Sequence, residues 1–137
     1  WFNYSGLIFF YLTLINDANK YGDVVVLLNS DEWLVNKKGK AFLPFYERKI
    51  ILNNIKGVID VIEFNDNDKS CIDGLRKAKK KYNGKTLKFA NGGDRNDKTT
   101  PETTFCEHNG IVALWGIGGN DKSNSSSWIL KKWNEKS

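Results

Sequence analysis

Short runs of β-branched and other apolar residues alternate with longer amphipathic segments along most of this chain. The runs cover residues 23–29, 57–64, 86–90 and 111–115. Continuous apolar runs of this length are typical of strands that are buried on both faces of a parallel sheet. The repetition predicts an α/β fold, in which a Rossmann-like, doubly wound parallel sheet lies inside a three-layer α/β/α sandwich.

The segments between the runs predict helices with recognisable ends. Pro44 is placed to begin one helix, and Thr100 followed by Pro101 is a typical start for another, which Gly110 would stop. The buried side of the helix after Pro44 is expected to carry Ile50, Ile51, Leu52 and Ile55. The predicted helices cover residues 12–20, 44–56, 68–82 and 100–110, with a last one from about residue 125. Residues 1–5 are interpreted as the remainder of a leading strand, and residues 116–124 as a loop.

The size and composition of the chain favour one globular domain over residues 1–137. Hydrophobic residues make up 40% and charged residues 27%, and no apolar stretch is long enough for a membrane span. We therefore expect a cytoplasmic protein without a membrane partner. Cys71 and Cys106 are expected to be reduced thiols, because their spacing fits no metal site and the chain has one histidine. The absence of methionine and the start at Trp1 indicate that this is not a native translation start.

The formal net charge is +5, and the densest basic run is residues 76–81. Such a run could be a nucleic-acid surface or the solvated end of a helix. Nucleic-acid binders usually interleave basic residues with exposed aromatic residues, and none do so here. We therefore expect a helix end and no nucleic-acid partner, while the positive balance suits a small anionic ligand.

Polar residues follow the first apolar run, where the carboxyl edge of the sheet is expected. Asn29, Ser30 and Asp31 would form a turn and a helix N-cap. Residues 37–40, Lys-Lys-Gly-Lys, could form a basic flap over a triphosphate or could be ordinary solvated surface.

Arg48 is placed one turn into a predicted helix, where the helix dipole disfavours a cation. An anion bound in the cleft would explain this position. A salt bridge to Asp31 or to Glu47 is the alternative.

Two further groups of small residues are expected at the same edge of the sheet. Gly92 and Gly93 permit close backbone approach, and Asp94 could accept a hydrogen bond from a ribose or a base, or could simply cap a turn. Ser125, Ser126 and Ser127 would place hydroxyl and backbone N–H groups at a helix N-terminus, which suits an anion but also suits an ordinary N-cap. Together the two groups predict a nucleotide site.

His108 is expected to be solvated near a helix end and to have no catalytic role.

In this order, the motifs resemble the HxGH nucleotidyltransferase superfamily, and in particular its cytidylyltransferase-like branch. That branch includes glycerol-3-phosphate cytidylyltransferases and the adenylyltransferase domains of ADP-heptose synthesis. The likeness runs from about Asp17 to Trp133. It is carried by residues 18–23, Asn29-Ser30-Asp31-Glu32, the lysines of residues 37–40, Pro44 with Glu47-Arg48, Gly92-Gly93-Asp94, Pro101-Glu102, and Ser125-Ser126-Ser127-x-Ile129.

The resemblance implies transfer of a nucleotidyl group from CTP or ATP to a small phosphorylated sugar or polyol, with Mg²⁺ assisting and pyrophosphate leaving. It implies that Lys38 and Arg48 hold the triphosphate as catalytic residues. Gly92, Gly93 and Asp94 would bind the nucleoside, and Ser125, Ser126 and Ser127 would bind phosphate oxygens. Members of the branch are often homodimers. No protein metal ligands are implied.

The two histidines that define the superfamily have no counterpart in this sequence. Counting back from Ala18 by the family's spacing places Ile8 and Tyr11 at their positions. Either part of the catalytic loop is lost from this sequence, or the chain is a non-catalytic nucleotide-binding domain of the same fold. A basic RNA-binding module is a third hypothesis, and it predicts an affinity for RNA that falls steeply with salt.

Overall fold

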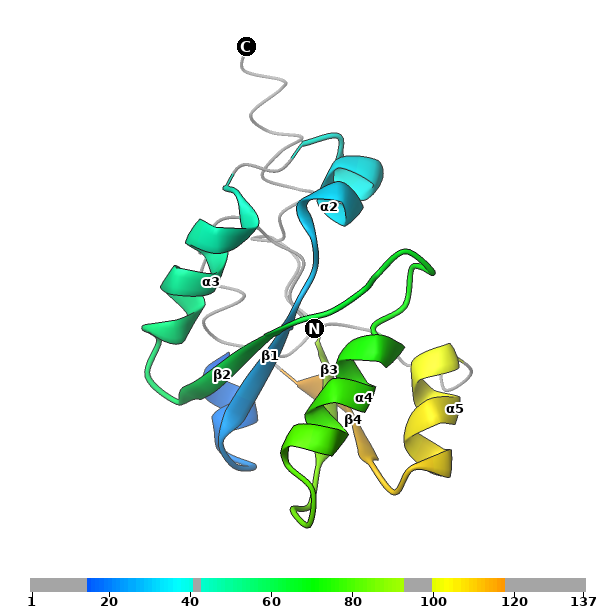
Figure 1. The fold of residues 1–137 in the computed structure, drawn as a ribbon. Helices are drawn as coiled ribbons and strands as arrows, with labels where there is room; N and C mark the ends of the chain where they lie inside the picture. The colour runs from blue at the N-terminus through cyan, green and yellow to red at the C-terminus, as the bar shows by residue number, and fades with distance from the viewer. Residues whose placement is uncertain (1–14, 41–42, 93–99, 118–137) are drawn as a thin grey trace.

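The computed structural model describes residues 15–40, 43–92 and 100–117, which contain two pairs of parallel strands (Figure 1). Strand β1 (Val24–Leu28) is hydrogen-bonded to β2 (Val58–Glu63). Strand β3 (Lys88–Gly92) is hydrogen-bonded to β4 (Val112–Ile117). The chain is thus a mixed α/β protein with parallel strands, as the sequence predicts at this level.

Helices separate the strands along the chain. Residues 15–19 are helical and precede β1, and α2 and α3 lie between β1 and β2. Figure 1 shows α4 in front of the strands with α5 beside it. The bounds are α2 (Asp31–Lys38), α3 (Phe45–Asn53), α4 (Ile72–Lys81) and α5 (Pro101–His108).

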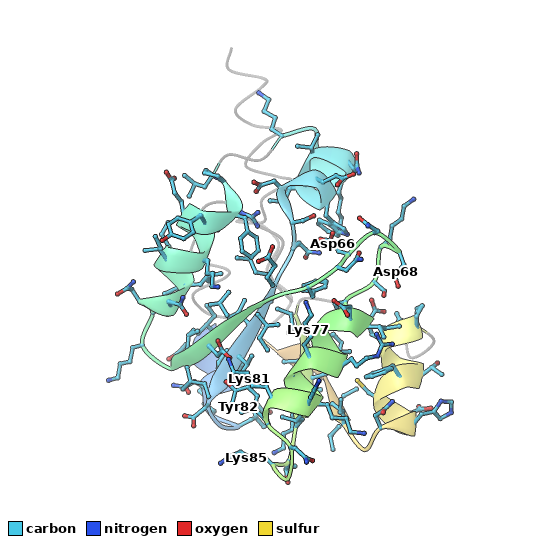
Figure 2. All side chains as sticks on the ribbon, in the orientation of Figure 1. Asp66, Asp68, Lys77, Lys81, Tyr82 and Lys85 are labelled. Atoms are coloured by element: carbon cyan, nitrogen blue, oxygen red, sulfur yellow. The ribbon has the colours of Figure 1, made fainter. Side chains whose placement is uncertain are left out.

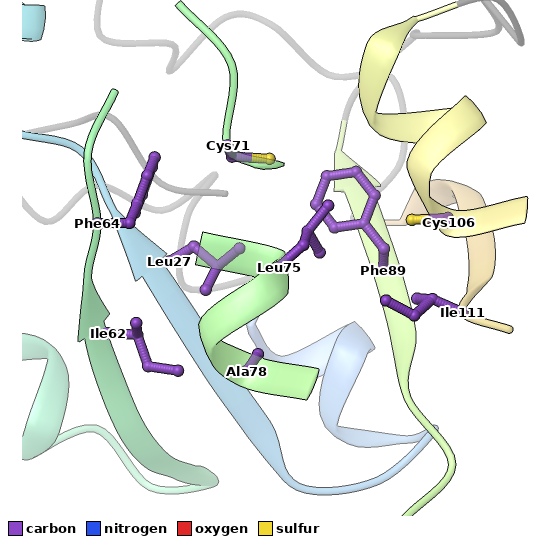
Figure 3. Packing of buried hydrophobic residues seen from close by; sticks show 9 residues of the cluster. All are labelled: Leu27, Ile62, Phe64, Cys71, Leu75, Ala78, Phe89, Cys106 and Ile111. Carbon is purple, nitrogen blue, oxygen red and sulfur yellow. The ribbon is translucent and has the colours of Figure 1, made fainter. Parts of the chain in front are cut away.

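The hydrophobic core consists of two clusters that share β1. Val26 and Leu28 belong to the first cluster, together with Ile15 and with Leu52 of α3. Leu27 belongs to the second, which α4 and α5 complete (Figure 3). Because successive side chains of a strand point to opposite faces, helices cover both faces of β1. The second cluster consists of Leu27, Ile62, Phe64, Cys71, Leu75, Ala78, Phe89, Cys106 and Ile111.

The predicted helix starts at Ser30 and Thr100 are confirmed. The Ser30 hydroxyl accepts a hydrogen bond from the Trp33 N–H at 3.1 Å, and the Thr100 hydroxyl accepts one from the Thr103 N–H at 3.2 Å. Pro101 occupies the first turn of α5, where its missing N–H costs nothing. Each cap satisfies an N–H group that has no partner within its helix.

Three sequence predictions were wrong in detail. Residues 31–38 form α2, whereas the sequence analysis predicts no helix over this range. The apolar residues Trp33, Leu34 and Val35 are consecutive and give no helical periodicity. Ile50 is 45% exposed, although it was expected on the buried side of α3. Helix α4 begins at Ile72 and not at residue 68, because the preceding residues form a turn.

The carboxyl ends of β3 and β4 were also placed too early. Gly92 pairs with Ile117, so both strands continue beyond the predicted ends at residues 90 and 115. Residues 116 and 117 are therefore strand and not loop. Glycine retains both backbone hydrogen-bonding groups, so the ladder can continue through it.

Candidate functional site

A buried polar cluster lies at the carboxyl ends of β1 and β2. Its three members, Asn29, Ser30 and Asp66, are named here the Asp66 cluster. The Asp66 carboxylate accepts hydrogen bonds from the Asn29 side-chain amide at 3.1 Å, and from the Ser30 N–H and hydroxyl at 2.8 Å each. Asn29 is 1% exposed and Asp66 is 6% exposed. Figure 2 shows Asp66 on the loop after β2, close to α2. The cluster fixes the turn through which β1 leads into α2.

Arg48 strengthens the same turn from α3. Its side chain is almost fully buried, and its guanidinium donates to the carbonyl oxygens of Leu43 at 3.1 Å and Asn29 at 2.9 Å. A third contact is an ion pair with Asp31 at 2.5 Å. The salt bridge to Asp31, which the sequence offered as the alternative to an anion site, is therefore present. The guanidinium carbon also lies 5.5 Å from the centre of the Phe45 ring. The described contacts of the guanidinium are thus with groups of the protein, and its contact with a triphosphate stays a prediction.

Lys38 is the last residue of α2, and Gly39 ends the helix. Gly39 has φ +81°, a left-handed conformation that favours glycine, and its N–H donates to the Val35 carbonyl at 2.9 Å. The Lys37 ammonium lies 4.5 Å from the centre of the Trp33 ring. Residues 37–40 thus lie at the C-terminal end of a helix, which favours cations even without a ligand.

The predicted nucleoside and phosphate contacts fall largely outside the described residues. Gly92 is the last residue of β3, paired with Ile117 of β4. Gly93, Asp94, Ser125, Ser126 and Ser127 lie outside the described residues. Their predicted roles in nucleotide binding therefore stay predictions.

Sequence reasoning missed Asp66 and underrated Asn29. Asp66 follows the end of β2 by three residues, so an acidic residue after a buried strand was the available signal. Asn29 was interpreted only as part of a turn. Its Oδ1 atom is buried, and no hydrogen-bond partner for it is found among the described residues. An amide oxygen without a partner is costly to bury, so this atom is a candidate acceptor for a bound molecule or water.

Two buried thiols lie beside a buried carboxylate in the second core cluster. A carboxylate oxygen of Glu102, which is 5% exposed, accepts a hydrogen bond from the Cys71 N–H at 3.3 Å. Burial, together with the charge of Glu102, raises the pKa of Cys71 to about 12 and that of Cys106 to about 11. Both thiols are free, as predicted, and their raised pKa values make them poor nucleophiles.

The described residues do not form a metal site. Within residues 15–40, 43–92 and 100–117, no group of three or more histidine, cysteine or acidic side chains could hold an ion. Asp66 and Asp31 are already engaged with donors of the protein. Mg²⁺ stays a prediction from the resemblance, and an ion held mainly by substrate phosphates would need few protein ligands.

His108 lies in the last turn of α5 and is exposed, as the sequence predicts. Among the helices of the described segments, none has the length and apolar character needed to cross a membrane.

No protein-family model matches this sequence. No curated protein matches it significantly either.

Proposed function

We propose that this chain is a nucleotidyltransferase domain that transfers a nucleotidyl group from CTP or ATP to a small phosphorylated sugar or polyol. An oxygen of the acceptor would attack the α-phosphorus, the bond to the β-phosphate would break, and pyrophosphate would leave. Such reactions depend mainly on positioning and on neutralisation of charge. Lys38 would contact the triphosphate.

The proposal includes the finer architecture, in which both strand pairs belong to one doubly wound sheet with helices on its two faces. The sharing of β1 between two core clusters supports this arrangement. In such sheets, ligands bind outside the carboxyl ends of the strands, where the strand order reverses. The Asp66 cluster follows the carboxyl ends of β1 and β2, which supports a ligand site on this side of the proposed sheet.

The observation that carries the proposal is the way α2 is anchored at the end of β1. Asp66, on the loop after β2, binds Ser30, and Arg48 of α3 binds the Asn29 carbonyl. Both contacts hold the turn that leads into α2. A helix fixed in this way would hold Lys38 in one place, and preorganised charge is what a polyphosphate site requires. In this proposal, Arg48 acts by positioning the turn.

Calorimetric titration with CTP, ATP and GTP in the presence of Mg²⁺ tests the binding. We expect Lys38→Ala to weaken binding of the preferred nucleotide by about 10-fold or more, as for the loss of one charge-assisted hydrogen bond. Lys56→Ala, which removes an exposed lysine after α3, is the matched control. Absence of binding for all three nucleotides would refute the proposal.

A non-catalytic nucleotide-binding domain is the second candidate, because the sequence contains one histidine and that residue is exposed on α5. Release of pyrophosphate in the presence of small phosphorylated polyols distinguishes the two. Nucleotide binding without pyrophosphate release for any acceptor would favour this second function.

A further inference from the structure

Asparagine directly precedes glycine at three places in the sequence. In such a pair, the backbone nitrogen of the glycine can attack the amide carbon of the asparagine side chain. Glycine favours this attack because it has no side chain to hinder the approach and because it allows many backbone conformations. Whether a pair reacts in the folded protein therefore depends on how firmly the structure holds it. The three pairs are Asn83-Gly84, Asn91-Gly92 and Asn109-Gly110.

Asn83 and Gly84 lie in the turn between α4 and β3. The Lys85 N–H donates to the Tyr82 carbonyl at 3.1 Å and closes the turn around the pair; Figure 2 labels both of these flanking residues. Asn83 and Gly84 are exposed, and Gly84 has φ +84°. Among the described residues, neither the Asn83 side chain nor the Gly84 N–H has a hydrogen-bond partner. An exposed turn of this kind changes conformation at little cost in free energy, so the Gly84 nitrogen can reach the Asn83 side chain.

The other two pairs are held by the fold. Asn91 and Gly92 belong to β3, whose backbone is hydrogen-bonded to β4. The partly buried Asn109 side chain donates to the Phe105 carbonyl at 2.8 Å and accepts from the Lys79 ammonium at 3.0 Å. A strand or a side chain that is fixed in this way must be released before the glycine nitrogen can attack.

We propose that Asn83 is a site of spontaneous deamidation, and that the fold confines the reaction to this pair among the three. The Gly84 nitrogen gives its proton to water or hydroxide and forms a bond to the Asn83 Cγ atom. The bond between Cγ and Nδ2 breaks, and Nδ2 takes up protons from water and leaves as ammonia. Water then opens the resulting cyclic imide at either carbonyl carbon, which gives aspartate or isoaspartate.

The product changes both the charge and the backbone of the turn. A carboxylate replaces the neutral amide between two exposed lysines, Lys81 and Lys85. Isoaspartate also lengthens the main chain by one carbon atom. The turn leads into the amino end of β3, whereas the Asp66 cluster lies at the carboxyl ends of β1 and β2. This inference therefore does not depend on the proposed nucleotidyltransferase activity.

Incubation of the unmodified full chain at mildly alkaline pH, followed by peptide mapping with mass spectrometry, tests the proposal. The three asparagines are compared in one sample, so that buffer and temperature are the same for all. We expect Asn83 to be converted at least about 10-fold faster than Asn91 or Asn109, since hydrogen bonds must first break around the other two. Equal or faster conversion at Asn91 or Asn109 would overturn the proposal.

The same measurement in urea separates the effect of the fold from that of the local sequence. In the unfolded chain all three pairs are exposed and flexible, so we expect their rates to agree within a few-fold. A preference for Asn83 that persisted unchanged in urea would contradict the proposal, because it would then come from the neighbouring residues and not from the fold.

Asn83→Gln identifies the reacting residue. Glutamine must close a larger ring than asparagine, so the acidic form that accumulates in the unmodified protein should be absent from this variant on isoelectric focusing. Asn53→Gln is the matched control, because Asn53 is an exposed asparagine at the end of α3 that does not precede glycine. We expect the control to form the acidic species at the unmodified rate. Its formation at that same rate in Asn83→Gln would refute the assignment to Asn83.

Discussion

Two clusters centred on aspartates, one within β2 and one after it, bind helical segments, and they differ in what surrounds the carboxylate. In the Asp66 cluster, the carboxylate is buried and accepts hydrogen bonds from an amide, a hydroxyl and a backbone N–H. In the second cluster, Asp60 of β2 accepts hydrogen bonds from the Lys81 ammonium at 2.5 Å and the Tyr82 hydroxyl at 2.8 Å. We name this second group the Asp60 cluster; Figure 2 shows Lys81 and Tyr82 at the end of α4.

The comparison predicts that burial, more than charge, decides how much each cluster stabilises the fold. The Lys81 side chain is 57% exposed, so water can replace it beside Asp60. Around Asp66, the Asn29 amide is buried and the Ser30 donors are partly buried, so they would lose their partner while water has little access to them. Substitutions around Asp66 should therefore destabilise the protein more than substitutions around Asp60.

Arg48→Met is expected to have the largest effect. It removes a buried guanidinium and leaves the Asn29 and Leu43 carbonyls without their donor. We expect the free energy of unfolding to fall by about 2–4 kcal/mol, since one buried and one partly buried acceptor lose their donor while the exposed Asp31 can turn to water. Urea denaturation measures this change.

Lys49→Met is the matched control for Arg48, because it removes a neighbouring cation of α3 that is not buried. We expect this control to change the free energy of unfolding by less than about 0.5 kcal/mol. Equal losses in the two variants would contradict a special role for the buried guanidinium.

Asp66→Ala is expected to have the next largest effect. It leaves the Asn29 amide and both donors of Ser30 without an acceptor, and we expect a loss of about 1–3 kcal/mol in the free energy of unfolding. Asp68→Ala is the control, since Asp68 also accepts two hydrogen bonds from one serine but is exposed. A smaller loss for Asp66 than for Asp68 would break the comparison between buried and exposed carboxylates.

Tyr82→Phe probes the Asp60 cluster and should have a smaller effect. Burial raises the pKa of Tyr82 to about 12, with the hydrogen bond to Asp60 and its charge as further causes, so the hydroxyl stays a donor at neutral pH. Loss of this one bond should lower the free energy of unfolding by about 0.5–1 kcal/mol. Tyr46→Phe, at a residue of α3 that is 71% exposed, is the control. Thermal or urea denaturation of both variants provides the measurement.

The sequence predicted best the features that depend on local physical preferences. Strand β1 lies within the predicted residues 23–29 and β2 within 57–64, because burial on both faces leaves a continuous apolar run. Ser30 was recognisable as an N-cap from its neighbours alone. The strand ends at Gly92 and Ile117 were not recognisable from the sequence. They depend on hydrogen bonding between β3 and β4, which are far apart in the chain.

The candidate site was predictable only in part for the same reason. Asp66 lies 36 residues from Ser30, and its position shortly after a buried strand is the one signal in the sequence, which does not identify Ser30 or Asn29 as its partners. The partners of Arg48, which are Asn29 after β1 and Asp31 of α2, likewise depend on how α3 packs. The helix dipole identifies Arg48 as unusual from the sequence alone. The sequence does not decide between a bound anion, a salt bridge to Asp31 and a salt bridge to Glu47.

Lys81→Met should produce the smallest effect and a characteristic dependence on pH. Burial raises the pKa of Asp60, but the hydrogen bonds from Lys81 and Tyr82 and the charge of Lys81 outweigh it, so the pKa is lowered overall. A carboxylate whose pKa is lower in the folded state stabilises the fold above its unfolded pKa, and this stabilisation disappears as the pH falls through the folded value.

At neutral pH, Lys81→Met should therefore cost less than about 1 kcal/mol, as for other exposed ion pairs. The difference from the unmodified protein should shrink below about pH 4, where unpaired aspartates become protonated. Lys80→Met, at the neighbouring exposed lysine, should show no such convergence. Urea denaturation between pH 7 and pH 3 measures both variants; a difference that stays constant would show that Lys81 stabilises α4 through packing or the helix dipole and not through Asp60.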